Sequence, residues 1–338
     1  MEQEKIKAIE LFIATSARAE SVSISAMSLL AGGAVQENWL LNISVIGGIF
    51  SGELECVLRC DSSTAGVASS HSRAEEFALL EAVSSIGVTV PQPLWLCEDG
   101  GVIGRPFFIM RRSNGVAAGH LLAKDLRYGS DRKELARRLG AELAKIHSIL
   151  PPQSNLQFLT WYEEAPANHL IAQHRQFLDQ HHTPHPALEW GLRWLERHAP
   201  QREAIALCHR DYRTGNYLVD ENGLTAILDW EFAGWSDPLE DIGWFCARCW
   251  RFGKLDKEAG GIGAREDFYA GYEAQSGASI NRESVRYWEV MAHMNWAIIA
   301  IQQAERFVSG RENSLLLALT GHIVPELEME ILNMTEID

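Results

Sequence analysis

Residues 207–241 decide the fold of this chain, and they read LCHRDYRTGNYLVDENGLTAILDWEFAGWSDPLED. At their centre two short apolar runs, 217–219 and 224–228, flank an Asn-Gly pair. Asn-Gly between alternating apolar runs predicts a tight β-hairpin. The stretch therefore predicts a polar loop, a short hairpin, and an acidic residue, Asp229, directly after the second strand.

The polar loop and Asp229 combine three side chains that suit phosphoryl transfer. Asp211 stands five residues before Asn216, so one loop supplies both a carboxylate and an amide. Phosphoryl transfer requires a partner for the acceptor hydroxyl, metal ions that neutralise charge between the phosphates, and rigid positioning. Asp211 suits the proton acceptor, and Asn216 and Asp229 offer the hard oxygen ligands that Mg²⁺ prefers. Singly, each residue is also typical of a turn, but their joint spacing favours this chemistry.

The chain before residue 112 predicts a small, β-rich unit. Apolar residues at helical spacing predict a helix over 2–18, and alternating residues over 21–59 predict a hairpin-rich sheet. A helix over 73–85, ended by Gly87, and strands near 94–97 and 107–110 complete the unit. Residues 112–119 indicate a linker.

Beyond this linker the chain is mostly helical. Ser130 is the expected N-cap of a helix with Leu135, Leu139 and Leu143 on one face. Further helices are expected at about 238–251, 265–275, 284–308 and 313–333. The pattern predicts an α+β fold with two lobes, residues 1–111 and residues 112–338.

Composition excludes several classes of protein. The chain has 338 residues, of which 46% are hydrophobic and 22% charged, as in ordinary globular proteins. No apolar run reaches the roughly 18 residues of a membrane span, and the N-terminus does not resemble a secretory signal. We therefore expect a cytoplasmic protein with no membrane partner. The net charge of −15 also argues against a nucleic-acid partner, while it says little about the substrate and nothing about oligomeric state.

Six cysteines are scattered along the chain, and only Cys246 and Cys249 have CxxC spacing. A zinc site needs about four ligands, and no second such pair is present. Buried thiols on a Trp-rich helix are therefore favoured over a metal or redox site.

Residues 207–251 resemble the aminoglycoside phosphotransferase family, which shares its fold with protein kinases. Members show HGDxxxxN, then DW or DF, then GDPxxD, and this chain has HRDYRTGN, LDWE and SDPLED in the same order. The residues of these motifs most resemble those of a branch that includes kinase domains associated with acyl-CoA dehydrogenases. The resemblance implies a bilobal protein-kinase-like fold, with a small β-rich N-terminal lobe and a larger, mainly helical C-terminal lobe.

The resemblance also implies an ATP-dependent small-molecule kinase and assigns roles to single residues. Asp211 corresponds to the catalytic base, and Asn216 and Asp229 correspond to Mg²⁺ ligands. Glu231 stands where choline-kinase-like proteins use a carboxylate near the second metal ion.

Other motif residues have structural roles by this resemblance. Asp237 and Asp241 belong to the segment that braces the catalytic loop, and a helix beginning at Pro238 favours the same role. His147 matches a family position, although a His on an apolar helix is more often structural. Arg210 replaces the usual Gly, and a tolerated side chain is favoured there over an anchor for a phosphorylated segment.

The nucleotide side departs from the kinase pattern, because no lysine occurs between Lys7 and Lys124. Arg59, at the end of an apolar strand, is the charged candidate for the ATP phosphates, with Glu76 on the following helix placed to orient it. An ordinary surface arginine is the alternative. The remaining expectations are weaker: a hairpin tip at Gly32 and Gly33 beside the triphosphate, and an adenine-binding hinge at Met110.

The acceptor is a small molecule with a hydroxyl group, and the branch implies a hydroxyacyl-CoA or a hydroxy acid. An aminoglycoside or another amino alcohol is the alternative. A nucleotide-binding module without catalysis is a second class of function, motivated by the missing lysine. ATP and GTP are not distinguished by these motifs.

Overall fold

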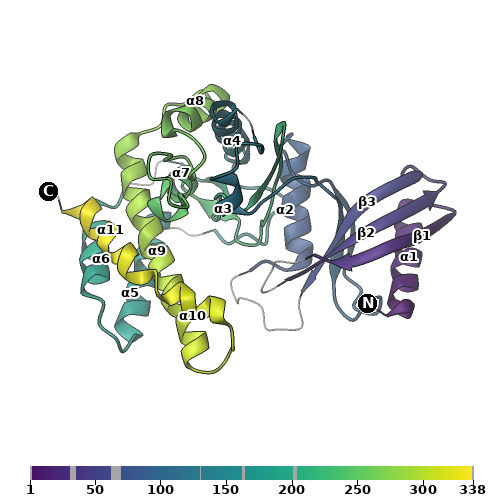
Figure 1. Ribbon diagram of the computed structural model, residues 1–338, viewed down its shortest axis with the longest axis horizontal. Helices are drawn as coiled ribbons and strands as arrows, with labels where there is room; N and C mark the ends of the chain where they lie inside the picture. The colour runs from purple at the N-terminus through teal and green to yellow at the C-terminus, as the bar shows by residue number, and fades with distance from the viewer. Residues whose placement is uncertain are drawn as a thin grey trace.

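The computed structural model describes residues 2–30, 36–61, 70–129, 131–161, 164–200 and 204–336. Two lobes lie side by side, a small one built on a β-sheet and a larger, mainly helical one (Figure 1). The expected bilobal α+β organisation is confirmed, while the exact boundary at residue 111 stays a prediction. Gly32, Gly33 and Ser130 lie outside the described residues.

The small lobe is a sheet with a helix on each face. In the described residues its strands pair antiparallel in the order β1-β2-β3-β5-β4. Their bounds are β1 Ser21–Leu29, β2 Gln36–Ile46, β3 Gly52–Asp61, β4 Pro93–Cys97 and β5 Phe107–Arg111, and the helices are α1 Gln3–Ala17 and α2 Arg73–Ser85. Adjacent residues of a strand face opposite sides. Phe107 packs on Phe12 of α1 and Phe108 on Phe77 of α2, so the two helices cover opposite faces.

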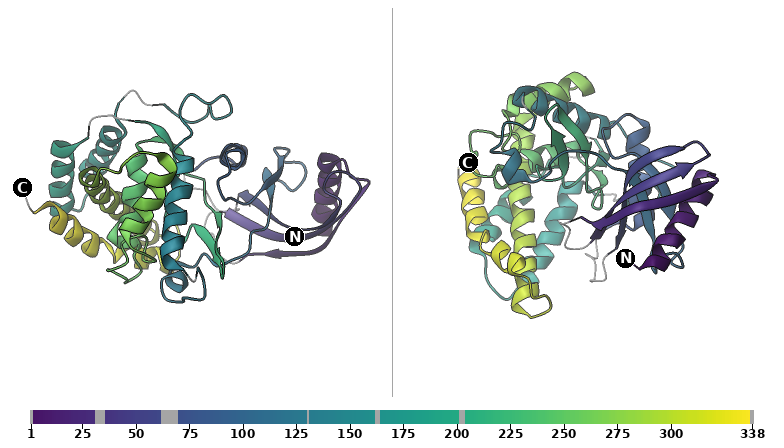
Figure 2. Two further views of the ribbon diagram at one scale, coloured as in Figure 1. Left: turned by 90° about the horizontal axis from the view of Figure 1, so that it is seen from above. Right: turned by 45° about the vertical axis from the view of Figure 1, so that its right-hand side comes forward.

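Helix α2 lies on the face of the sheet that meets the large lobe, whereas α1 lies at the far end of the molecule (Figure 2). Phe77, Leu80 and Val83 of α2 belong to the same buried cluster as Leu139 and Tyr212 of the large lobe. Ser72 begins α2 with a capping box: its side chain accepts from the Glu75 N–H, and the Glu75 carboxylate accepts in return. The cap fixes the start of the helix that carries Glu76.

The large lobe is mainly helical and also contains two small two-stranded antiparallel sheets. Its strands are β6 Ala206–Cys208 paired with β9 Gly234–Ser236, and β7 Tyr217–Asp220 paired with β8 Gly223–Ile227. Its helices are α3 Gly119–Leu122, α4 Arg132–Ile146, α5 Pro166–Gln180, α6 Pro186–His198, α7 Pro238–Cys246, α8 Arg265–Ser276, α9 Arg282–Val308, α10 Leu315–Gly321 and α11 Val324–Thr335. The hairpin predicted at Asn222-Gly223 is β7–β8. None of the described helices is both long and apolar enough to span a bilayer.

Three predicted helix boundaries are wrong. Asp131 caps α4 through a hydrogen bond from the Glu134 N–H (3.0 Å), one residue after the expected Ser130. Helix α7 ends at Cys246, where Ala247 takes an extended backbone before a 3₁₀ turn. The helix expected over 313–333 is two helices, because Pro325 lacks an N–H and starts α11 within its first turn.

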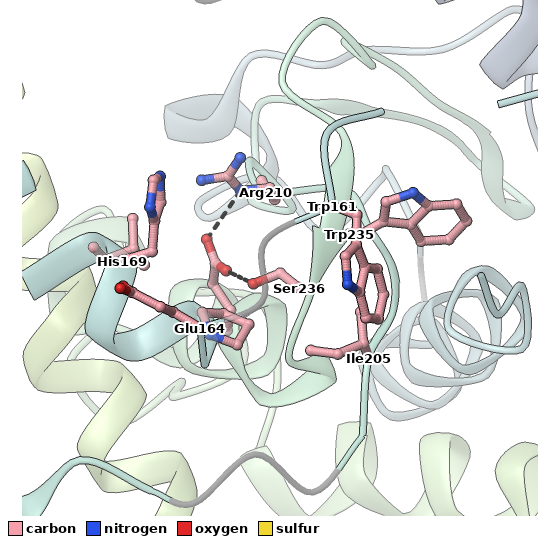
Figure 3. Close-up of a pocket in the computed structure, with 10 residues that line it drawn as sticks. Trp161, Glu164, His169, Ile205, Arg210, Trp235 and Ser236 are labelled. Carbon is pink, nitrogen blue, oxygen red and sulfur yellow. Dashed lines mark hydrogen bonds and ion pairs between the residues drawn. The ribbon is translucent and has the colours of Figure 1, made fainter. Parts of the chain in front are cut away.

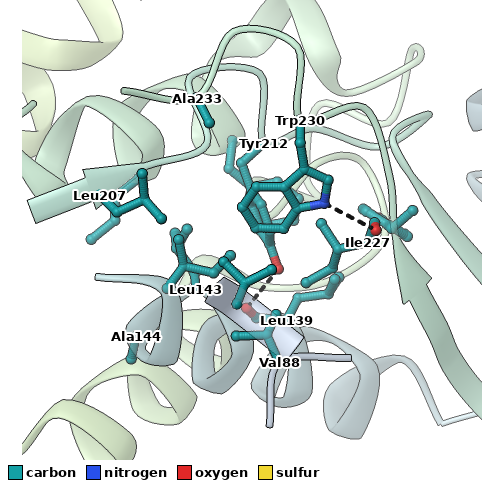
Figure 4. Packing of buried hydrophobic residues seen from close by; sticks show 14 of the residues in the cluster. Val88, Leu139, Leu143, Ala144, Leu207, Tyr212, Ile227, Trp230 and Ala233 are labelled. Atoms are coloured by element: carbon teal, nitrogen blue, oxygen red, sulfur yellow. Dashed lines mark hydrogen bonds between the residues drawn. The ribbon is translucent and has the colours of Figure 1, made fainter. Parts of the chain in front are cut away.

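The catalytic loop rests on the core between the lobes (Figure 4). The Tyr212 hydroxyl donates to the Leu139 carbonyl of α4 at 2.8 Å. Trp230 is buried nearby and its indole stacks at an angle against His209. These contacts fix both ends of the segment that carries the predicted site.

Candidate active site

Asp211 is held by three donors from two directions. Its Oδ1 accepts from Arg213 Nε and from Trp244 Nε1 of α7, both at 3.0 Å. Its Oδ2 accepts from Asn216 Nδ2, which also donates to the Asp211 carbonyl at 2.9 Å. Burial raises the pKa of the Asp211 carboxyl above its ordinary value, against the opposing effect of Arg213. A fixed carboxylate with a raised pKa suits a general base.

The His209 side chain fixes the backbone of the loop that carries Asp211. Its Nε2 lies 2.8 Å from the Leu228 carbonyl, which can only accept, so Nε2 carries the proton. Its Nδ1 then accepts the Asp211 N–H at 3.3 Å. The imidazole therefore links Leu228, the residue before Asp229, to the loop that carries Asp211.

Asp241 braces the same loop from α7, as the sequence suggested. Its two oxygens accept the N–H groups of His209 and Arg210 at 2.7 Å, and Oδ2 also contacts His147 Nε2 at 3.1 Å. Burial opposes ionisation, yet the donors from His147 and the loop prevail and hold the pKa of Asp241 below its ordinary value. Asp237 caps α7 by accepting the Leu239 N–H at 2.9 Å.

Arg210 takes a left-handed backbone with φ 62°. This region favours glycine, which explains why related motifs carry Gly at this position. The side chain turns to Glu240 of α7, with Nε 3.3 Å from Oε1. The Glu240 carboxylate therefore pairs with the positive charge of Arg210 within the protein, as expected of a tolerated side chain.

The predicted pairing of Arg59 with Glu76 is present. Arg59 Nε lies 2.9 Å from Glu76 Oε1, and its Nη2 reaches Asp229 Oδ1 at 3.3 Å. Burial disfavours the charged guanidinium, but Glu76 and Asp229 prevail and raise the pKa of Arg59. Arg59 therefore stands as a buried cation at the junction of the two lobes, and not as a surface residue.

Arg73 is a residue of this cluster that the sequence analysis missed. Its guanidinium contacts Glu76 one helical turn away, Asp61 at 3.1 Å and the His71 carbonyl at 2.9 Å. The i,i+3 spacing of Arg73 and Glu76 was a usable signal. Glu76 thus serves two buried arginines.

The oxygen atoms around Asn216 and Asp229 fit a Mg²⁺ ion. Because Asn216 Nδ2 donates to Asp211, its carbonyl oxygen is turned toward other partners. Asp229 gives one oxygen to Arg59, which leaves the second for a ligand. Glu231, two residues on, accepts from Gln36 Nε2 of β2. Burial raises the pKa of Glu231 to about 7. The positive charge of Arg59 opposes this rise, and the negative charge of Asp229 adds to it. Carboxylate and amide oxygens are the ligand types that Mg²⁺ prefers, so the role of Asn216, Asp229 and Glu231 as metal ligands stays a prediction.

The remaining predicted residues are placed as follows. Met110 lies on β5, half-buried, opposite Val57 of β3, and its contact with a nucleotide stays a prediction. Cys246 is buried and Cys249 half-buried, and within the described chain all six cysteines are free thiols. Burial raises the pKa of the Cys246 thiol to about 12. The expectation of two buried thiols on one helix is wrong for Cys249, which lies in the 3₁₀ turn after α7.

The bilobal fold and the polar side chains gathered around Asp211 agree with an ATP-dependent small-molecule kinase. The "Phosphotransferase enzyme family" matches residues 27–286, and the chain belongs to that family. Its fold is shared with a Ralstonia eutropha structure provisionally described as an aminoglycoside phosphotransferase (TM-score 0.77, 19% identity, 98% of each chain). A spectinomycin phosphotransferase in complex with ADP and spectinomycin is also similar (TM-score 0.64, 13% identity, 96% of this chain and 98% of that one).

Among curated proteins, the chain is similar to acyl-CoA dehydrogenase family members. It is 28% identical to member 10 of Mus musculus over 57% of this chain and 18% of that protein. It is 25% identical to member 11 of Pongo abelii over 76% of this chain and 34% of that protein. The chain thus spans about a fifth and about a third of the length of these two relatives.

Proposed function

We propose that this enzyme transfers the γ-phosphoryl group of ATP to the hydroxyl of a hydroxyacyl-CoA or a related hydroxy acid. The observation that carries the reaction is the pair formed by Asp211 and Asn216, with Asp229 near enough to raise the pKa of Asp211 and itself paired with Arg59 of the sheet. The names of the curated relatives support an acyl acceptor.

In the proposed reaction the Asp211 carboxylate accepts the proton of the acceptor hydroxyl while that oxygen bonds to the γ-phosphorus. The bond from the γ-phosphorus to the β,γ-bridging oxygen breaks, and ADP leaves. Arg213 and Trp244 hold the carboxylate in place during this step.

On the nucleotide side, Asn216, Asp229 and Glu231 would hold Mg²⁺, which neutralises charge between the phosphates. Arg59, oriented by Glu76, contacts the ATP phosphates from the sheet. In this proposal Met110 and the backbone of β5 contact the adenine.

The test is ADP release measured over hydroxyacyl-CoAs, hydroxy acids, aminoglycosides and small alcohols, with product phosphorylation confirmed by mass. Asp211→Asn should lower kcat by about 100- to 10,000-fold and bind Mg·ATP as the wild type does. If only amino alcohols were phosphorylated, the proposed acyl acceptor would be wrong and an amino alcohol would take its place. Absence of ADP formation with every acceptor would favour a nucleotide-binding module.

A further inference from the structure

A recess opens beside Arg210, between the segment before α5 and strand β9 (Figure 3). Trp161, Trp235 and Ile205 line one side, and His169 and Glu164 stand opposite. The recess is a shallow groove that is open to solvent: about 380 Å³ lies within its outline, of which about 30 Å³ is cavity space. Leu170, Arg210 and Glu240 also line a second, smaller hollow with about 10 Å³ of cavity space, so the two are neighbours across the Arg210–Glu240 pair.

The second hollow lies against Trp244, the side chain that contacts Asp211. Trp244, Trp288, Met291 and Ala292 line it. The Trp244 indole that forms this wall donates to Asp211 Oδ1 at 3.0 Å. We call the two hollows together the tryptophan recess. A molecule that fills it lies against the same side chain that positions the base.

The tryptophan recess has one apolar side, formed by Trp161, Ile205 and Trp235, and its polar residues include the paired charges of Arg210 and Glu240. Glu240 is bonded to Arg210 and accepts from the Ser236 hydroxyl. Burial, with Arg210 nearby, lowers the pKa of His169, so this imidazole is neutral at pH 7. Glu164 is exposed at the rim. A polyamine with many hydroxyls would lack partners here, because polar groups buried without hydrogen bonds are disfavoured.

We propose that the tryptophan recess holds the acyl chain of the acceptor and sets the preferred chain length, with the reacting hydroxyl directed at Asp211. This inference rests on the proposed function. Each further methylene buried in an apolar site raises kcat/KM by about fourfold, until the recess is full.

Two variants test the assignment from opposite ends of the recess. Trp161→Ala removes a wall at the rim, and Ala292→Leu fills the end next to Trp244. Trp190→Ala is the matched control, because Trp190 is 53% exposed against 48% for Trp161 and lies on α6 outside the recess. Thermal unfolding identifies any variant that fails to fold, in which case the other variant carries the test.

Binding is measured by calorimetry with straight-chain acyl-CoAs of two to ten carbons that lack a hydroxyl, and kcat/KM with the matching hydroxyacyl-CoAs. We expect affinity to rise with chain length in the wild type and Trp190→Ala. Trp161→Ala and Ala292→Leu should each weaken the longer chains by about tenfold or more, and the two-carbon compound by less.

The outcomes separate this inference from the proposed function. Chain-dependent binding that the two variants abolish, without phosphorylation of any hydroxyacyl-CoA, supports the recess and overturns the proposed reaction. Phosphorylation with no dependence on chain length supports the reaction and overturns the recess assignment. An equal effect of Trp190→Ala would also overturn the assignment.

Discussion

Replacing Arg59 tests how the sheet lobe binds ATP without a lysine. Arg59 is a buried guanidinium with one nitrogen on Glu76 and another on Asp229. A charge-assisted hydrogen bond contributes about 1.5–3 kcal/mol, so loss of one phosphate contact should lower kcat/KM for ATP by roughly 10- to 150-fold. Arg59→Ala should show this loss through a higher apparent KM for ATP and a lower kcat.

The cost to stability should be moderate. Removing one partner of a buried ion pair costs about 3–5 kcal/mol when the other charge is left alone. Glu76 retains Arg73 in Arg59→Ala, so we expect a smaller loss, of about 1–3 kcal/mol. Arg59→Lys should recover part of the ATP kinetics, because the charge returns without the planar fork. Glu76→Gln should give a milder defect, since the amide keeps one acceptor for the two arginines.

The assay is steady-state ADP release with ATP varied at a fixed acceptor concentration, alongside thermal unfolding. Arg105→Ala is the control, because Arg105 forms a partly exposed pair with Glu37 (2.7 Å) at the same sheet and is not paired with Asp229. Its ATP kinetics should match the wild type. If Arg59→Ala also matched the wild type, the phosphates would be held by backbone groups and metal alone, and the role of Arg59 would have to be abandoned.

Three further predictions concern the metal ligands, the loop brace and the helix packing. Asp229→Ala should raise the Mg²⁺ concentration needed for nucleotide binding by at least about tenfold, and an unchanged magnesium titration would remove Asp229 from the ligand set. Asp241→Asn should lose about 2–4 kcal/mol at pH 7. The pKa of Asp241 is lowered in the folded state, so its contribution is present above pH 4 and lost as pH falls below its ordinary value of 3.8. The variant should therefore unfold with a weaker acid dependence, and an identical acid profile would contradict this. Gly140→Ala places a Cβ 2.0 Å from the Phe268 carbonyl, so it should destabilise α4–α8 packing by about 1–3 kcal/mol although Ala favours helices. Gly100→Ala, whose nearest contacts are at 4.0 Å, is the control in thermal unfolding, and equal melting temperatures would refute the packing argument.

The loop that carries Asp211 was predictable because the residues that define it are close together in the sequence. Asp211 and Asn216 are five residues apart and Asp229 ends the next hairpin, so one short stretch of backbone brings them together. Trp244 is 33 residues from Asp211, and its contact depends on the orientation of α7. No periodicity in the sequence reports that orientation, which is why Trp244 was missed as a partner of the base.

Helix ends were predicted less well than helix positions, for two different reasons. Ser130 and Asp131 are both good N-cap residues, and propensity alone does not choose between neighbours. Pro325 is a start signal for a new helix, and the apolar run on both sides of it masked that signal. Tertiary packing decides the first case, whereas closer attention to proline would have settled the second.

The substitution of arginine for lysine follows from how the lobes meet. Small-lobe residues contact the segment 229–233 at several points: Gln36 donates to the Glu231 carboxylate, and the His71 N–H donates to the Glu231 carbonyl at 2.9 Å. Arg59 joins this junction because its Nε serves Glu76 in its own lobe while its Nη2 serves Asp229 in the other. A lysine has one nitrogen on a flexible stem and cannot hold both carboxylates in a fixed plane. The guanidinium therefore holds the Asp229 carboxylate from the sheet, and in the proposed reaction it also supplies the positive charge for the ATP phosphates.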